Sequence, residues 1–198
     1  MVVEYEQLLR DIRSCKHCEK HLPFAPRPVV HFSTISKIVV IGQAPGTKVH
    51  QTGIPWNDPS GERLRNWLDV SREEFYNTKN FGIVPMGFCY PGRGKSGDLP
   101  PRPECAPLWM DKAIQSMRAH KLILLIGQYS QNYFLKDRKK NTLTETVRNW
   151  KEYLPDYFVL PHPSPRNNIW LKKNEWFEKE AVPELKKRVH KILQNPTQ

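Results

Sequence analysis

The stretch Ile38-Val39-Val40-Ile41-Gly42-Gln43-Ala44-Pro45-Gly46 decides the fold, because an apolar run of strand length breaks abruptly at a loop of glycine and proline. A run of branched apolar residues without polar alternation is typical of a strand that is buried on both faces of a sheet. Similar runs follow at Leu122–Ile126 and Tyr157–Leu160, and a further strand is expected at Phe81–Met86. These four segments predict a short sheet with mainly parallel strands.

Helical patterns alternate with the predicted strands. We expect long helices at Tyr5–Ser14, Pro107–His120 and Glu175–Leu193, the last one interrupted or started afresh at Pro183. Other helices should begin at Asp58-Pro59-Ser60-Gly61-Glu62, after Gly127-Gln128-Tyr129-Ser130 and at the capping box Thr142-Leu143-Thr144-Glu145. The alternation predicts an α/β fold, a three-layer sandwich around a mainly parallel four-stranded sheet, with residues 1–198 in one domain. Functional loops should then gather at the carboxyl ends of the strands.

The composition is ordinary for a soluble globular domain, since 38% of the residues are hydrophobic and 26% are charged. No apolar run approaches the roughly 20 residues that a membrane span needs, and the start lacks the layout of a signal peptide. We therefore expect a cytoplasmic monomer without membrane contact. The net charge of +11 favours a polyanionic partner, although a basic balance is also common in proteins that never bind nucleic acid.

One histidine is held between prolines directly after the last predicted strand, in Leu160-Pro161-His162-Pro163-Ser164-Pro165-Arg166-Asn167-Asn168. Each proline fixes its own φ and biases the preceding residue toward extended geometry, so the loop is stiff. This stiffness suits a catalytic group, because little conformational freedom remains to be lost. An ordinary surface turn is the alternative, since proline and serine favour turns.

The cysteines form two pairs, Cys15-x2-Cys18 near the start and Cys89-x15-Cys105 in the middle, and none is left over. In a cytosolic protein such residues more plausibly bind a metal than form disulfides. Four thiolates hold either a tetrahedral zinc ion or a [4Fe-4S] cluster, and spacing alone does not decide between them. Buried thiols without a ligand are the third alternative. The tract inside the second pair looks too long and structureless for a simple connection, so it needs a function or a staple.

Three short motifs stand in order along the chain: Ile41-Gly42-Gln43-Ala44-Pro45-Gly46, Thr52-Gly53-Ile54-Pro55-Trp56 and His162-Pro163-Ser164-Pro165. Together they resemble the uracil-DNA glycosylase superfamily, and within it the iron-sulfur-containing branch that is usually called families 4 and 5. The second motif corresponds to the family's Thr-Gly-Arg-Pro-Phe. Each motif is weak alone, but all three lie at the expected strand ends with the four cysteines in register. The resemblance covers nearly the whole chain.

The resemblance implies a monofunctional DNA glycosylase that hydrolyses the N-glycosidic bond of a deaminated base, with uracil as first choice. The base must leave the stack before its reacting atoms are accessible. The transition state should be oxocarbenium-like, so the enzyme must stabilise negative charge on the departing base and position a water molecule. His162 would donate a hydrogen bond to the base oxygen. Trp56 would stack on the flipped base, with a position in the core as its alternative.

The resemblance also implies roles for the other residues of the site. Asp58 and Gln43 join His162 as catalytic residues, and Ser164 and Arg166 would contact DNA. The base would be contacted by Gly42, Gln43, Ala44, Trp56 and His162. A [4Fe-4S] cluster, favoured over zinc by the x15 interval of the family, would be held by Cys15, Cys18, Cys89 and Cys105. Loop position near the strand ends adds Arg93, Lys95 and Arg102 to the predicted DNA contacts, whereas the lysines after Asn174 alternate with glutamates as on a solvated helix.

Three departures from the family pattern bear on catalysis and on substrate choice. Gln43 stands where family 4 carries a glutamate, and Ala44 stands where the best-known uracil enzymes carry an aspartate. An amide cannot act as a base, so the candidate base is the nearest carboxylate, Asp58. Asp58 resembles the helper aspartate of family 5, or it simply caps the following helix. Pro85 stands near the asparagine that reads the imide edge of uracil in family 4. These departures leave hypoxanthine or another deaminated base as an alternative substrate, and a non-hydrolytic binder of damaged DNA as an alternative function.

Overall fold

The centre of the fold is a four-stranded sheet in the order β2-β1-β5-β6, in which all neighbouring strands are parallel. In this computed structural model, which describes residues 2–95 and 97–194, the strands are β1 (Ile38–Ile41), β2 (Phe81–Ile83), β5 (Leu122–Ile126) and β6 (Tyr157–Leu160). Every residue of β1, β2 and β5 is buried, as expected for a parallel sheet that is covered on both faces. The four predicted strands are therefore confirmed.

Strand β2 is shorter than predicted, because the expected strand extended to Met86. Pro85 has no backbone N–H, but Val84 N just before it still donates to the carbonyl oxygen of Val40 at 3.0 Å. Beyond it the chain runs beside the loop that follows β1 instead. The N–H of Met86 donates to the carbonyl oxygen of Gly42 at 2.9 Å, and the N–H of Gly87 donates to that of Gln43 at 2.9 Å. This segment therefore supports the backbone of the first motif.

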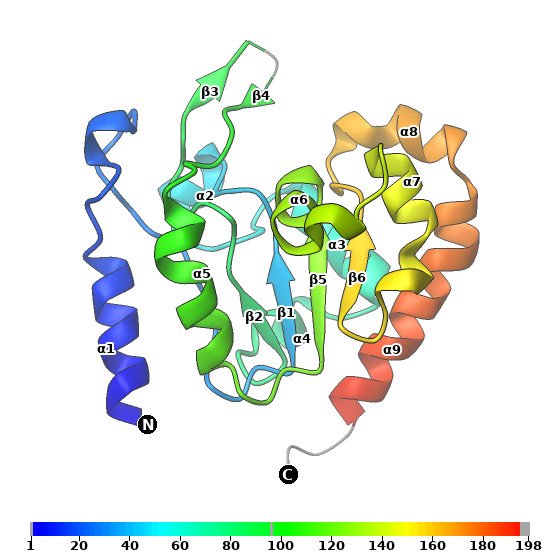
Figure 1. Cartoon of the computed structure of the whole chain (residues 1–198), viewed down its shortest axis with the longest axis horizontal. Helices are drawn as coiled ribbons and strands as arrows, with labels where there is room; N and C mark the ends of the chain where they lie inside the picture. The colour runs from blue at the N-terminus through cyan, green and yellow to red at the C-terminus, as the bar shows by residue number, and fades with distance from the viewer. Residues whose placement is uncertain (1, 96, 195–198) are drawn as a thin grey trace.

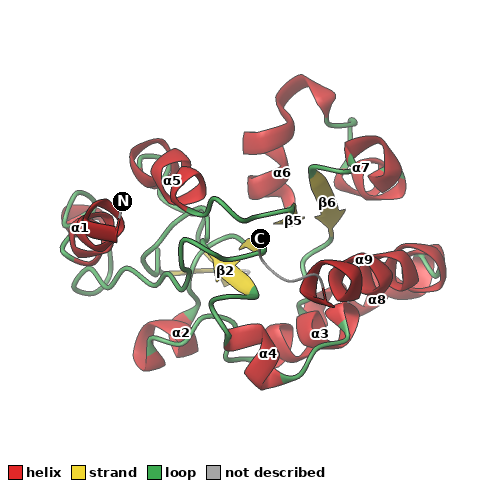
Figure 2. Cartoon of the chain, turned by 90° about the horizontal axis from the view of Figure 1, so that it is seen from below, coloured by secondary structure: helices red, strands yellow, loops and turns green. Residues whose placement is uncertain are grey.

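Helices cover both faces of the sheet, which confirms the predicted three-layer sandwich (Figures 1 and 2). One face carries α5 (Cys105–Ser116), α6 (Gln128–Leu135) and α7 (Leu143–Arg148). The other carries α2 (Thr47–Thr52), α3 (Pro59–Leu68), α4 (Arg72–Tyr76), α8 (Asn168–Lys173) and α9 (Val182–Gln194). The predicted capping box at the start of α7 is confirmed, since Glu145 N donates to Thr142 Oγ1 at 3.1 Å. No helix of the described part of the chain is long and apolar enough to cross a membrane.

The chain termini show two differences from the predicted helices. Helix α1 (Val2–Arg13) begins before the expected Tyr5 and ends before the expected Ser14. It stands outside the layers and packs against α5, with Leu9 and Ile12 buried (Figure 1). The expected helix at Glu175–Leu193 is divided, because a π-helical turn precedes α9, which begins one residue before Pro183. The backbone is helical on both sides of this turn, so no new helix begins at Pro183. The alternative of an interrupted helix is the correct one, since π-helical turns occur inside α-helices.

The tract between Cys89 and Cys105 is not structureless, which corrects the expectation from the sequence. It contains a small antiparallel hairpin made of β3 (Arg93–Gly94) and β4 (Gly97–Asp98). Leu99 N closes the base of the hairpin by donating to Gly92 O at 2.8 Å. Ser96, between the two strands, lies outside the described residues. The hairpin rises above the carboxyl ends of the sheet (Figure 1).

The exposed edge of β2 is covered by a single antiparallel bridge. His31 N donates to Ile83 O at 3.0 Å, and Ile83 N donates to His31 O at 2.6 Å. The ring of His31 adds a hydrogen bond to the carbonyl oxygen of Tyr76 at 2.8 Å. A covered edge offers fewer unpaired backbone groups to another chain.

Candidate active site

The three sequence motifs meet at the indole ring of Trp56. The ring centroids of Trp56 and His162 are 5.6 Å apart, and the two planes are inclined by 31°. The indole also lies against the backbone of Gly42, where a Cβ atom would come within 2.7 Å of Trp56 Cζ2. Glycine is needed at this position because only a residue without a side chain leaves room for the ring. Three of the predicted base-binding residues therefore form one group.

The backbone of Trp56 is held in a conformation that is unusual for a bulky residue, with φ at 55°. The carbonyl oxygen of Trp56 lies so close to Gly61 that any Cβ atom there would overlap it. The same oxygen accepts a hydrogen bond from Nη1 of Arg65 at 3.3 Å, and this arginine is only 7% exposed. Tyr76 Oη donates to the carbonyl oxygen of Pro55 at 2.7 Å. Such strained conformations persist where the surroundings fix them, as at ligand-binding sites.

His162 lies in the loop after β6, and its backbone is fixed locally. Asn167 Nδ2 donates to the carbonyl oxygen of His162 at 2.7 Å. Burial lowers the pKa of the His162 imidazole below its usual 6.5, and this effect outweighs the Asp58 carboxylate, which raises the pKa. The ring is therefore neutral at neutral pH and carries one N–H donor.

Asp58 caps helix α3, so the structural alternative for this residue is realised. Its Oδ1 accepts a hydrogen bond from the N–H of Gly61 at 2.8 Å. The carboxylate is nevertheless near enough to His162 to raise the pKa of the imidazole. Asp58 thus combines a capping role with an electrostatic influence on the site, and the two roles do not exclude each other.

Gln43 is less available than the sequence suggested. Its side-chain Nε2 donates to the carbonyl oxygen of Leu99 at 3.1 Å, just after the β3–β4 hairpin. The amide oxygen and the second hydrogen of Nε2 remain available for other contacts. Ala44 is half-buried in the same loop, and Pro85 is buried in the neighbouring segment.

The predicted DNA-binding residues divide between two places. Ser164 caps the turn after the histidine, with its Oγ accepting the N–H of Arg166 at 3.2 Å. The guanidinium of Arg166 lies against Gly97 of the hairpin, which also carries exposed Arg93 and Lys95. Arg102 lies elsewhere: it is paired with Glu104 at 2.7 Å, beside the cysteines. The cationic side chains of the hairpin and of the histidine loop therefore lie in the same region, whereas Arg102 lies apart from them.

The sequence model of the uracil DNA glycosylase superfamily matches residues 30–186. The chain belongs to this superfamily. Members of the uracil DNA glycosylase superfamily are generally DNA glycosylases that act on damaged bases in DNA. The matched region includes all three motifs and the second cysteine pair, whereas Cys15 and Cys18 precede it.

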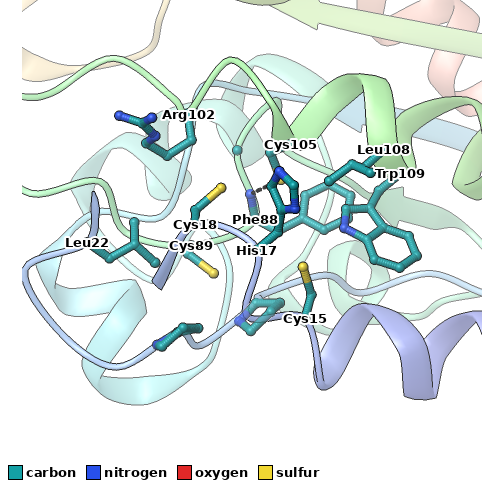
Figure 3. Close-up of a pocket in the computed structure, with 13 residues that line it drawn as sticks. Cys15, His17, Cys18, Leu22, Phe88, Cys89, Arg102, Cys105, Leu108 and Trp109 are labelled. Atoms are coloured by element: carbon teal, nitrogen blue, oxygen red, sulfur yellow. Dashed lines mark hydrogen bonds between the residues drawn. The ribbon is translucent and has the colours of Figure 1, made fainter. Parts of the chain in front are cut away.

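The four cysteines of this superfamily member line one pocket, although they come from segments that are far apart in the sequence (Figure 3). All four are free and half-buried. Apolar side chains complete the lining, among them Leu22, Phe88, Leu108 and Trp109. Among residues 2–95 and 97–194, no three or more His, Cys, Asp or Glu side chains lie close enough together to hold a single metal ion.

The thiols are partly buried, and hydrogen-bond donors lie beside them. Burial raises the pKa of Cys105 to about 12 and that of Cys89 to about 11. Phe88 N donates to the sulfur of Cys105 at 3.2 Å. Two further donors at the pocket, Trp109 Nε1 and Arg102 Nε, are buried and have no hydrogen-bond partner within the described part of the chain. Buried donors usually have partners, so these two suit a pocket that holds an acceptor-rich group.

Two residues near the site were missed in the sequence. Arg65 supports Trp56 from the buried face of α3, and its signal is a charge beside Leu64 and Leu68 on an apolar helix face. Asp98 lies on the hairpin close to Gly46. Its signal is weaker, because a single acid in a basic tract usually only balances charge.

Proposed function

We propose that the protein is a monofunctional DNA glycosylase that hydrolyses the N-glycosidic bond of a deaminated base in DNA, with uracil as its first substrate. The contact between Trp56 and His162 above Gly42 is the observation that carries this proposal. It combines an aromatic face for a flipped base with a hydrogen-bond donor next to that face. Flipped bases are recognised by such stacking together with hydrogen bonds to the base edge.

His162 serves the leaving group in this proposal. As the glycosidic bond breaks, negative charge develops on the oxygen of the departing base. A neutral imidazole that is shielded from water donates its N–H to this oxygen, and such a donor is most effective where water is excluded. The low pKa of His162 also means that the ring does not need to lose a proton at neutral pH before a base is bound. The Asp58 carboxylate adds negative charge near the sugar, where positive charge develops.

The duplex would lie over the loops at the carboxyl ends of the strands. Arg93 and Lys95 of the hairpin, together with Arg166 of the histidine loop, which lies against Gly97, supply cations on this side. Phosphate contacts of this kind give affinity and orientation without sequence preference. The net charge of +11 agrees with a polyanionic substrate.

The four cysteines would hold a [4Fe-4S] cluster, with zinc as the alternative. In such a cluster each cysteine binds a different iron, so the sulfur atoms need not crowd around one ion. This agrees with four thiols that share a pocket without a tight single-ion site in the described residues. The unpartnered donors Trp109 Nε1 and Arg102 Nε suit hydrogen bonds to cluster or cysteine sulfur. The cluster would tie the segment after α1 to the hairpin tract, and hydrolysis would need no redox step from it.

Two alternatives rest on specific residues. The side chain of Pro85 offers no hydrogen bond near the position where family 4 has its uracil-reading asparagine, and this favours hypoxanthine or another deaminated base. Gln43 offers no carboxylate and is bound to Leu99, and this favours a protein that binds damaged DNA without hydrolysing it.

One assay separates these functions. The purified protein is incubated with duplexes that contain a single uracil, hypoxanthine, xanthine or mismatched thymine, and abasic sites are then cleaved with alkali. We expect strand cleavage at uracil and little at an undamaged control. Cleavage only at hypoxanthine or xanthine would show that this base, and not uracil, is the substrate. Tight binding to damaged duplexes without any cleavage would refute hydrolysis.

A further inference from the structure

The β3–β4 hairpin touches both loops that form the candidate active site. At its base, Gln43 Nε2 donates to the carbonyl oxygen of Leu99 at 3.1 Å. At the other strand end, the guanidinium of Arg166 lies against Gly97, where a side chain would overlap it. The hairpin thus spans from the first motif to the loop that follows His162.

Asp98 lies on this hairpin between the two contacts. Its Oδ2 is 3.2 Å from the position that a Cβ atom of Gly46 would occupy, so the carboxylate rests on the backbone of the first motif. Gly97 precedes it with φ at 148°, a value that favours glycine and directs the chain at this point. The approach of the carboxylate depends on two glycines, one on the hairpin and one on the loop.

The charges around Asp98 come from three elements. Arg93 is its partner across the hairpin, and both Arg93 and Arg166 lower the pKa of the carboxyl group. Partial desolvation of the carboxylate, in a residue that is exposed overall, and the negative charge of Asp58 act in the opposite direction and prevail, so the pKa of Asp98 is raised. The charge of Asp58 therefore acts on both Asp98 and His162.

We propose that Asp98 is a catalytic carboxylate of this site, which positions the attacking water and accepts its proton. The inference rests on the proposed glycosylase function. When the C1′–N bond breaks, its electron pair leaves with the base; the water oxygen then forms the new bond to C1′. The water proton passes to Asp98 and from there to solvent. A carboxylate supplied by the hairpin accounts for a chain that has none at Gln43 or Ala44, and it gives Gln43 a positioning role through Leu99.

Single-turnover kinetics on the base that the wild type excises tests this role. We expect Asp98→Asn to slow excision by about a hundredfold, as for the loss of a positioned proton acceptor. DNA affinity should not weaken, because the variant removes a negative charge from a DNA-facing surface. The wild-type rate should rise with pH through the pKa of Asp98, and Asp98→Asn should lack this rise. Asp137→Asn, an exposed change outside the site, is the matched control.

A second variant moves the carboxylate without removing it. Gly46 has φ at −83°, which alanine also adopts, so Gly46→Ala should displace mainly Asp98. We expect Gly46→Ala to slow excision in the wild type and to have no further effect in an Asp98→Ala background. Melting curves establish that each variant is folded.

The outcomes are distinguishable. A wild-type rate and pH profile for Asp98→Asn, or a loss of affinity alone, would show that Asp98 only balances the charges of Arg93 and Arg166. Additive effects of the Gly46 and Asp98 changes would also overturn the proposal. A wild-type protein that excises no base would refute the glycosylase itself and, with it, this role of Asp98.

Discussion

Trp56 and His162 are in ring contact at a centroid distance of 5.6 Å, so a base cannot be inserted between them without separating the rings. A flipped base must therefore stack on the free part of the indole while its edge meets the imidazole. The position of Trp56 is set by Gly42 and by the carbonyl contact with Arg65. Binding and chemistry should consequently respond to changes at either side of this pair.

We expect Trp56→Phe to retain most binding and Trp56→Ala to lose about 1 to 3 kcal/mol, the usual value of one base–aromatic stack. Gly42→Ala should resemble Trp56→Ala, because its Cβ atom would displace the indole. Fluorescence anisotropy with a damaged duplex and with its undamaged counterpart measures the difference. Equal losses on both duplexes would contradict a role in holding the damaged base.

We expect His162→Ala to slow single-turnover excision by about a hundredfold to a thousandfold, because it removes a donor aimed at developing negative charge. Asp58→Asn should cost less, since asparagine also caps a helix and keeps the bond to Gly61. Gln43→Ala should act mainly through the hairpin. If Asp58→Asn abolished excision while His162→Ala left it unchanged, the assignment of roles would be reversed.

The pKa of His162 should be measurably below 6.5, and Asp58→Asn should lower it further by removing the charge that raises it. Ring signals followed by NMR over a pH series give both values. Because the folded state binds the proton less readily, His162 contributes fully to stability above the unfolded pKa. This contribution declines as pH falls through 6.5 toward the folded value.

Urea unfolding provides an independent check of the same linkage. The wild type should lose more free energy of unfolding than His162→Gln between about pH 8 and about pH 5. An equal loss in both proteins would mean that His162 titrates normally.

Protein purified without oxygen should be brown, with broad absorbance near about 400 nm and about four irons per chain. Cys89→Ala should lower stability as well as iron content, because the ligands join distant segments. Cys105→Ala is the matched variant from the same pair. A colourless protein with stoichiometric zinc would establish the zinc alternative.

Affinity for DNA should fall steeply with salt, and the hairpin cations should contribute more than those of α9. Lys186 is 3.6 Å from Asp69 in an ion pair, whereas Lys95 is an exposed side chain of the hairpin. Arg93→Ala or Lys95→Ala should reduce the slope of log affinity against log salt by about one. A larger reduction for Lys186→Ala or Lys187→Ala would place the DNA on another face.

The sheet could be predicted from the sequence because its strands are continuous apolar runs. Strands β1, β5 and β6 begin and end at the predicted residues, and only β2 stops early, at the segment with Pro85. The hairpin could not be predicted, because strands of two residues have no periodicity to detect. The binding of Gln43 to Leu99 is a contact over 56 positions and has no local signature. The motif residues were found, but which of their atoms are already engaged was visible only in three dimensions.

The strand order has a consequence for the growing chain. The central strand β1 pairs with β5, which is synthesised much later. The loop with His162 follows β6, which comes after the other three strands of the sheet along the chain. Such long-range pairing forms slowly, because distant segments lose conformational entropy on coming together before their contacts stabilise the chain. A nascent chain therefore carries the hairpin cations well before it carries the imidazole. Under the proposed function, such a chain could contact nucleic acid before it could hydrolyse a glycosidic bond.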